Sequence, residues 1–226
     1  MPFLRGMVGR AVEWAWGVVL PRRCRGCEVA FAGAAPLGLC GLCVAALPDI
    51  RGPSGAILCR ERIHVPWVQA GLRLRAAPHV RQLVHAFKYG GDGSLAVSAG
   101  RWLAAGEPPD LEAPVLVPVP VHLRRRLHRG YNQAERIATG LQAEWGWPVC
   151  AGGLVRTAHR TSITGLGRRD RAAMLRTCFV PGRGIAGRRV VLVDDVLTTG
   201  ATFRAAAEAV EAGGGEVVGA VVLVLS

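Results

Sequence analysis

The sequence predicts an α/β fold in which helices flank a parallel sheet. Residues 188–193 (RRVVLV) and 216–225 (EVVGAVVLVL) are continuous apolar runs, which are typical of strands buried on both faces. Between them, residues 201–212 (ATFRAAAEAVEA) have high helix propensity and are followed by three glycines. A strand, a helix and a strand at this spacing form a crossover unit, so both strands are expected to be parallel. Residues 114–121 (PVLVPVPV) predict another buried strand, which ends at prolines.

Further elements are predicted before and after that strand. Residues 68–74 (VQAGLRL) alternate in polarity as a strand does. Residues 79–89 (HVRQLVHAFKY) carry apolar side chains at helical spacing, and residues 94–105 predict a second helix. Residues 130–143 predict a helix with one apolar face. Helices therefore alternate with strands along most of the chain, as the α/β class requires.

Composition excludes several classes of protein. The chain has 226 residues, of which 50% are apolar and 19% charged, so a disordered protein is excluded and one core with a small appendage is expected. No apolar run reaches the roughly 18 residues that a membrane-spanning helix needs. Residues 7–20 are interrupted by Glu13, which predicts a short amphipathic helix and not a secretory signal. We therefore expect a cytoplasmic protein.

The charge is strongly basic and unevenly placed. The 28 basic and 16 acidic residues give a net charge of +12, and Lys88 is the only lysine. Residues 122–189 hold 14 arginines against three acidic residues. Such a segment favours a phosphate-bearing partner, either a nucleic acid, a nucleotide or pyrophosphate. The alternative is a solvated surface on a protein that is rich in arginine throughout.

Four of the seven cysteines form two C-x-x-C pairs. Cys24 and Cys27 are followed, after twelve residues, by Cys40 and Cys43. Two such turns predict a tetrahedral structural zinc site with no open position for catalysis. A disulfide pair is disfavoured in a cytoplasmic chain, and a thioredoxin-like motif would need a βαβ unit around one pair. The other cysteines are predicted to be small buried side chains: Cys59, Cys150 and Cys178.

Two domains follow from these patterns. Residues 1–60 are predicted to form an N-terminal helix and a zinc-finger-like module. Residues 67–226 are predicted to form the α/β domain. Residues 48–66 are rich in turn-forming residues and predict a linker with one or two short strands.

The stretch VVLVDDVLTTGAT, residues 190–202, carries the chemistry. Asp194 and Asp195 are expected where a buried strand ends, at the sheet edge where α/β proteins bind ligands. Two carboxylates there can accept hydrogen bonds from vicinal hydroxyls or hold hydrated Mg²⁺. The following loop enters a helix N-terminus, which favours an anion; it consists of Thr198, Thr199, Gly200, Ala201 and Thr202. The two parts together predict a site for a ribose 5-phosphate. The alternative is a plain strand–turn–helix whose threonines cap the helix.

The same stretch resembles the phosphoribosyl-pyrophosphate (PRPP) motif of type I phosphoribosyltransferases. Three further strings resemble the ComF family of competence-associated proteins: the cysteine pairs preceded by Pro-Arg-Arg, HAFKYGG, and PVPVHLRRRLHRGYNQAERIA. The resemblance implies a zinc-finger-like segment joined to a phosphoribosyltransferase-type parallel sheet flanked by helices. It also implies a role in DNA uptake during natural transformation.

Residue roles are implied by the same resemblance. Asp194 and Asp195 match the residues that bind the ribose hydroxyls at the catalytic centre, and residues 198–202 match the 5-phosphate loop. Arg124 lies in the place of the pyrophosphate loop, Arg129 begins the string RGYNQ, and Lys88 is a further candidate for a pyrophosphate contact. Mg²⁺ is expected to accompany PRPP.

Two functions are compatible with these residues. The first is a ComF-like protein that binds PRPP, a related ribose phosphate or a nucleotide, acts in DNA uptake with other competence proteins, and contacts single-stranded DNA. The second is an active transferase that moves phosphoribosyl from PRPP to a nucleobase or amine. Such a transfer is expected to be dissociative at the anomeric carbon, with the protein supplying position and charge.

Overall fold

The structure is a computed structural model. It describes residues 22–32, 36–74, 80, 83, 85–86, 93–105, 108–157 and 178–226, except the side chains of Arg22 and Arg125. The predicted helix at 7–20 lies outside the described residues. In the segment 79–89, the residues that the structure describes are helical.

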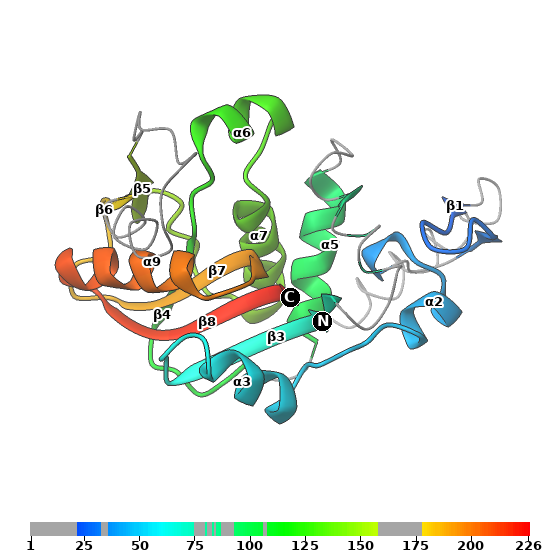
Figure 1. Ribbon diagram of the computed structural model, residues 1–226, viewed down its shortest axis with the longest axis horizontal. Helices are drawn as coiled ribbons and strands as arrows, with labels where there is room; N and C mark the ends of the chain where they lie inside the picture. Colours follow the sequence, from blue (N-terminus) through cyan, green and yellow to red (C-terminus); the bar gives the residue numbers. More distant parts are fainter. Residues whose placement is uncertain are drawn as a thin grey trace, which may run out of the picture.

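A four-stranded parallel sheet forms the centre of the molecule (Figure 1). Its strands lie in the order β3 (Trp67–Arg73), β8 (Glu216–Leu225), β7 (Arg189–Leu197) and β4 (Pro114–Pro118). All three neighbouring pairs are parallel. Valine and leucine point to both faces of β7 and β8, and the burial of nearly all of them explains why these strands appear in the sequence as unbroken apolar runs. The predicted α/β class is confirmed.

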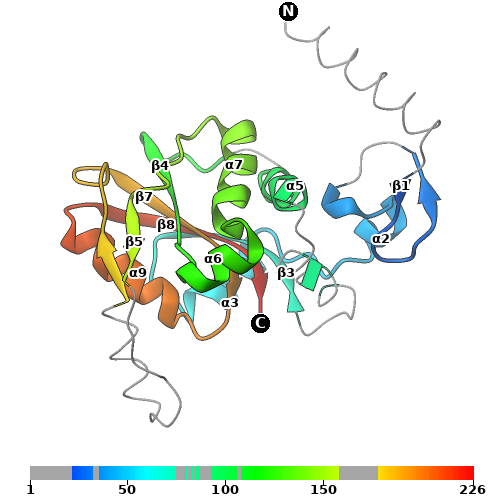
Figure 2. The same cartoon turned by 90° about the horizontal axis from the view of Figure 1, so that it is seen from above.

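Helices cover both faces of the sheet (Figure 2). On one face, α5 (Gly93–Leu103) and α7 (Gln133–Trp145) bury a leucine-rich core. On the other face, α3 (Pro53–Arg60) and α9 (Ala201–Ala212) bury a second core, and the short antiparallel pair β5 (Leu154–Arg156) and β6 (Phe179–Pro181) packs there as well. The sheet therefore separates two hydrophobic cores.

The four-cysteine segment packs on α5. It contains the antiparallel pair β1 (Arg22–Arg23) and β2 (Ala30–Phe31), the 3₁₀ turn η1 (Pro36–Gly38) and α2 (Gly41–Ala45). The backbone N–H of Leu37 donates to Ser98 Oγ on α5 at 3.2 Å. Leu37 and Leu39 are buried in the same core as Leu95. The segment thus shares a core with the α/β domain. The predicted division of the chain into one domain up to residue 60 and another from residue 67 stays a prediction.

One predicted segment differs from the structure, and one helix was not predicted. Residues 48–66 were expected to be a linker with short strands, but they contain α3, which starts with Pro53 directly after Gly52. Proline is favoured in the first turn of a helix, and Cys59 is fully buried against the sheet, so packing stabilises this helix. Residues that follow β4 also form a helix, α6 (Leu123–Arg129), which ends at Gly130 in the left-handed conformation.

The remaining elements agree closely with their predictions. α9 and β8 have the predicted bounds, while β3, β4, α5 and α7 are displaced by a few residues at their ends. The strand β7 was expected to end at Val193 and continues to Leu197, because β8 pairs with it as far as Leu225. Among the described residues, no helix is long and apolar enough to cross a membrane.

Candidate functional site

The acidic pair lies on the part of β7 that extends beyond β4. Pro118, the last residue of β4, pairs with Val193, whereas Asp194 is still paired with Val222 of β8. The sequence predicted the two aspartates where the strand ends. In the structure they lie inside β7, which continues to Leu197. Both side chains are half-buried at the carboxyl edge of the sheet. The difference arises because pairing with β8 outweighs the low strand propensity of aspartate.

Asp194 has an unusual electrostatic environment. Burial and the neighbouring charge of Asp195 raise the pKa of Asp194 well above its usual range, while the charge of Arg156 acts in the opposite direction. The backbone N–H of Asp195 donates to Asp194 Oδ1 at 2.8 Å. Asp194 is therefore harder to ionise than an exposed carboxyl, and a cation bound beside it would favour its ionised form.

The loop between β7 and α9 presents a helix N-terminus beside this pair. Gly200 precedes the first residue of α9 with φ +78°, a conformation that favours glycine. Thr199 Oγ1 accepts from the backbone N–H of Ala201 at 3.4 Å. The N–H groups in the first turn of a helix lack acceptors within the helix, so this loop offers donors and a positive helix dipole to an anion. Thr198 and Thr199 are exposed, and Thr202 is half-buried.

The residues that follow β4 border the same edge of the sheet. His122 Nδ1 accepts from the backbone N–H of Arg124 at 3.2 Å and so caps α6. The side chain of Arg124 is exposed, whereas Arg129 is half-buried and its Nη1 donates to Gln133 Oε1 at 3.2 Å. The side chain of Arg129, the last residue of α6, is therefore bonded to α7, while the side chain of Arg124 is open to solvent. Lys88 lies outside the described residues.

Asn132, in the string RGYNQ, connects α7 to the end of β4. Its Oδ1 accepts from the backbone N–H of Ala134 at 3.1 Å, which caps α7. Its Nδ2 donates to Val119 O at 3.2 Å. Asn132 is buried, so these bonds fix the start of the segment that the family resemblance assigns to pyrophosphate.

Arg156 is a site residue that the sequence did not single out. It ends β5, its Nη1 lies 3.5 Å from Pro120 O, and its guanidinium lies 5.2 Å from the ring centre of Phe179. Its charge also acts on Asp194. Arg156 therefore lies between the segment after β4 and the acidic pair. One arginine among many, outside every motif, gives no signal in the sequence for this position.

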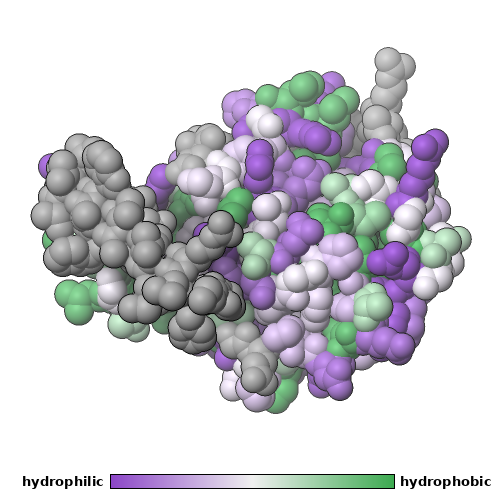
Figure 3. Space-filling model, turned by 180° about the vertical axis from the view of Figure 1, so that it is seen from behind, coloured by the Kyte–Doolittle hydropathy of each residue, from purple (hydrophilic) through white to green (hydrophobic). Residues whose placement is uncertain are grey.

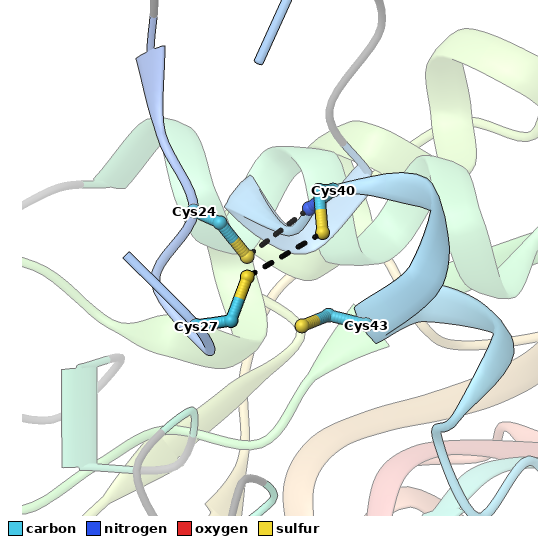
Figure 4. Close-up of side chains that lie close together, drawn as sticks. All are labelled: Cys24, Cys27, Cys40 and Cys43. Carbon is cyan, nitrogen blue, oxygen red and sulfur yellow. Dashed lines mark hydrogen bonds between the residues drawn. The ribbon is translucent and has the colours of Figure 1, made fainter. Parts of the chain in front are cut away.

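The four cysteines of the N-terminal segment converge (Figure 4). Their sulfur atoms all lie within 4.8 Å of one another, and the Cys27 and Cys40 sulfurs are 3.7 Å apart. Zinc–sulfur bonds of about 2.3 Å in a tetrahedron place sulfurs about 3.8 Å apart. Cys24 Sγ also accepts from the backbone N–H of Cys40 at 3.2 Å. The cluster could hold a structural metal ion.

The thiols of this cluster differ in acidity. Burial alone would raise the pKa of the Cys24 thiol, but hydrogen bonds from the backbone at Cys40, Cys27 and Gly26 outweigh burial and lower the pKa to about 6. Hydrogen bonds with Cys27 and Cys24 raise the pKa of the Cys43 thiol to about 12. One thiolate is therefore preformed at neutral pH, and a metal ion would displace protons from others.

The remaining cysteines lie outside the cluster. Cys59 is fully buried, as predicted, and burial raises the pKa of its thiol to about 11. Cys150 and Cys178 are only half-buried, so for these two the prediction of burial was too strong. Cys150 Sγ donates to Arg183 O at 3.3 Å.

The surface at α6 carries basic and apolar side chains, and Figure 3 shows hydrophilic and hydrophobic residues side by side on one face of the molecule. The side chains of Arg124 and Arg126 are exposed there. Leu123 and Leu127 are also exposed, although leucine is usually buried. This helix therefore offers an open surface beside the segment that follows β4.

Known proteins resemble parts of this chain. A family model described as the phosphoribosyl transferase domain matches residues 171–226. Competence protein F of Haemophilus influenzae is 36% identical over 91 residues, which cover 39% of this chain and 40% of that protein. DNA utilization protein YhgH of Escherichia coli K12 is 30% identical over 146 residues, covering 61% of this chain and 63% of that protein. The matched segments thus span less than two thirds of these relatives.

Further matches include a bifunctional protein and one solved structure. Bifunctional protein PyrR of Deinococcus radiodurans is 42% identical over 81 residues, covering 36% of this chain and 42% of that protein. The structure of the allosteric regulatory enzyme of purine biosynthesis aligns over 58% of this chain and 25% of its own, with 25% identity and a TM-score of 0.40. The sheet order, the family match that includes the stretch at 190–202, and the two competence-related proteins all agree. Parts of this chain are therefore similar to a phosphoribosyl transferase domain and to ComF-type, competence-related proteins.

Proposed function

We propose that this chain binds PRPP, or a related ribose 5-phosphate, at the carboxyl edge of β7. The observation that carries the proposal is the succession of Asp194, Asp195 and the loop 198–202 on one continuous connection from β7 to α9. The half-buried carboxylates suit the ribose hydroxyls. The first turn of α9 suits the 5-phosphate.

The pyrophosphate end of the ligand would lie toward the segment after β4. Arg156 and the basic residues of α6 supply positive charge there, and Asn132 holds the backbone of that segment. Mg²⁺ would come with the ligand and neutralise its phosphates. Asp194 and Asp195 are oxygen donors that fit this hard cation, directly or through its waters.

We place this binding in the context of DNA uptake. The support is the match to proteins named Competence protein F and DNA utilization protein YhgH, and the exposed arginines of α6. Single-stranded DNA would lie on this basic surface through its phosphates, and other competence proteins would be partners. The role belongs to the cytoplasm, where cysteine thiols stay reduced.

We also propose that the metal held by Cys24, Cys27, Cys40 and Cys43 is zinc. Four thiolates at tetrahedral spacing leave no open ligand position, so the ion would be structural.

Calorimetry with PRPP and Mg²⁺ tests the binding site. The wild type is expected to bind, and the double variant Asp194→Asn with Asp195→Asn is expected to lose binding while it keeps its circular dichroism spectrum. Asp110→Asn, an exposed aspartate outside the site, is the matched control and is expected to bind as the wild type does. Equal affinity of the wild type and the double variant would refute the assignment.

Transfer of phosphoribosyl is a second candidate, favoured by the match to the phosphoribosyl transferase domain. Release of pyrophosphate from PRPP, measured with a panel of nucleobases and amines, tests it. Binding of PRPP without release in the whole panel would favour a binding protein.

A further inference from the structure

Two guanidinium groups hold the back of the loop that follows β7. Arg62, just after α3, donates from Nη1 to the main-chain oxygen atoms of Thr198 and Ser226. Arg204, on α9, donates from Nη1 to Thr199 O at 3.0 Å and to Arg62 O at 2.7 Å. Consecutive carbonyl groups of the loop are therefore each held by an arginine.

These bonds determine where the loop's N–H groups point. In a planar trans peptide, the N–H and the C=O point in opposite directions. The carbonyl of Thr198 shares a peptide with the N–H of Thr199, and the carbonyl of Thr199 shares one with the N–H of Gly200. Because both carbonyls point to arginines, both N–H groups point away from them. Successive N–H groups on one side form an anion-binding concavity.

Gly200 permits this arrangement. A Cβ at this position would lie 2.3 Å from Arg62 O and 2.9 Å from Arg204 Nη1. Only glycine lets the backbone at Arg62 approach so closely. The backbone N–H of Ser226 also donates to Leu197 O at 2.9 Å, so the residue that Arg62 binds is itself fixed to the end of β7.

We propose that Arg62 and Arg204 are positioning residues for the 5-phosphate. They hold the carbonyl oxygens of Thr198 and Thr199 away from the ligand, so that the N–H groups of Thr199 and Gly200 face it. Their charges, held behind the loop, also favour an anion in front of it. This inference rests on the proposed function of the loop. It makes the end of α3, a segment far away in the sequence, part of the binding site.

The test compares two ligands in two matched variants. Arg62→Met removes the bonds to Thr198 O and Ser226 O. Arg60→Met removes a neighbouring exposed arginine that donates to Pro66 O, and serves as the control. Calorimetry uses ribose 5-phosphate, which needs the loop, and magnesium pyrophosphate, which would bind at the other end of the site.

We expect Arg62→Met to weaken ribose 5-phosphate about tenfold or more, as loss of a hydrogen bond to a charged group does. Magnesium pyrophosphate should bind Arg62→Met, Arg60→Met and the wild type alike. Equal weakening of both ligands, or of neither, would overturn the proposal. Arg62→Lys keeps the positive charge but loses the planar guanidinium group that donates to two acceptors. If this variant bound ribose 5-phosphate as tightly as the wild type, charge alone would suffice and the positioning role would be wrong.

Hydrogen exchange separates this inference from the proposed function. If the wild type binds neither ligand, the proposed function fails, but the loop can still be tested without a ligand. Mass spectrometry should then show faster amide exchange in residues 194–204 of Arg62→Met than in Arg60→Met or the wild type. Unchanged exchange in that segment would overturn the positioning role.

Discussion

Gly100 and Gly140 meet where α5 crosses α7. A Cβ on Gly100 would lie 2.1 Å from Ile137 O, and a Cβ on Gly140 would lie 2.1 Å from Val97 O. No side chain fits between the two backbones. The close crossing matters for the site, because the N-cap of α7 is Asn132, which holds the carbonyl of Val119 beside the end of β4.

The first prediction concerns this crossing. Gly140→Ala should lower the free energy of unfolding by about 1–3 kcal/mol or more, because the helices must separate to admit a methyl group. Urea denaturation measures the change. Gly152→Ala is the control, since a Cβ there meets nothing within 4 Å and Gly152 has no positive φ. A Gly140→Ala variant as stable as Gly152→Ala would contradict the packing argument.

The second prediction concerns the metal. Purified, reduced protein should contain one zinc per chain, and Cys24→Ser should lose it. Because Leu37 and Leu39 share a core with Leu95 on α5, loss of the metal should lower the melting temperature of the whole chain in one transition. Elemental analysis and scanning calorimetry measure both effects. Cys150→Ser, outside the cluster, should keep the metal. Equal zinc content in Cys24→Ser and Cys150→Ser would refute the ligand assignment.

The third prediction concerns protons released by the metal. The pKa values of Cys27 and Cys43 are raised, so both thiols are protonated at pH 7 and must lose their protons when zinc binds. Zinc affinity should therefore rise with pH. Titration calorimetry of the apoprotein in buffers of different ionisation enthalpy counts the protons. A binding enthalpy that does not depend on the buffer would show that the thiols were already ionised.

The fourth prediction uses the raised pKa of Asp194. In the unfolded chain this carboxyl ionises at a pKa of about 3.9. Folding stability should fall as the pH rises from there toward the higher pKa of the folded state, since the unfolded chain releases its proton first. Asp194→Asn should therefore stabilise the ligand-free protein by an amount that is near zero in acid and grows with pH. Denaturation of both proteins across pH tests this; a constant difference would be evidence against the shift.

The fifth prediction separates the two roles of Asn132. Asn132→Ala should lose about 1 kcal/mol or more of stability from the cap of α7, and also the bond to Val119 O. Asn132→Ser can keep the cap but is too short to reach Val119. We expect Asn132→Ser to recover part of the stability and none of the PRPP affinity that Asn132→Ala loses. Equal recovery of both would mean that the bond to Val119 has no role in binding.

The sequence predicts the centre of this molecule well and its connections poorly. Complete burial on both faces gives β7 and β8 an unmistakable composition, and the glycines after α9 mark its end. By contrast, α6 (LRRRLHR) is short and has only two apolar residues, Leu123 and Leu127, which are both exposed, so helical periodicity does not reveal it. α3 is also missed, although Gly52 followed by Pro53 is a signal for a helix start.

The candidate site shows the same division. The residues on the connection from β7 to α9 form a contiguous motif, so the sequence shows them together. Arg62 and Arg156 reach the same edge from other elements, and their hydrogen bonds span 136 residues and 36 residues of chain. Nothing local distinguishes them from the other arginines. Only the fold brings them to the site.

The position of β3 has a consequence for how the protein is made. Among the described strands of the sheet β3 pairs with β8 alone, and Trp67 lies beside Gly219; its other edge makes a single bridge, between Leu72 and Asp49. Of the strands that the structure describes, β8 comes last in the sequence, so β3 has no partner in the sheet until the chain has been synthesised as far as residue 225. Unpaired edges invite wrong pairings, and distant pairings form slowly. We therefore expect the pairing of β3 with β8, and with it the complete four-stranded sheet, to form late in folding.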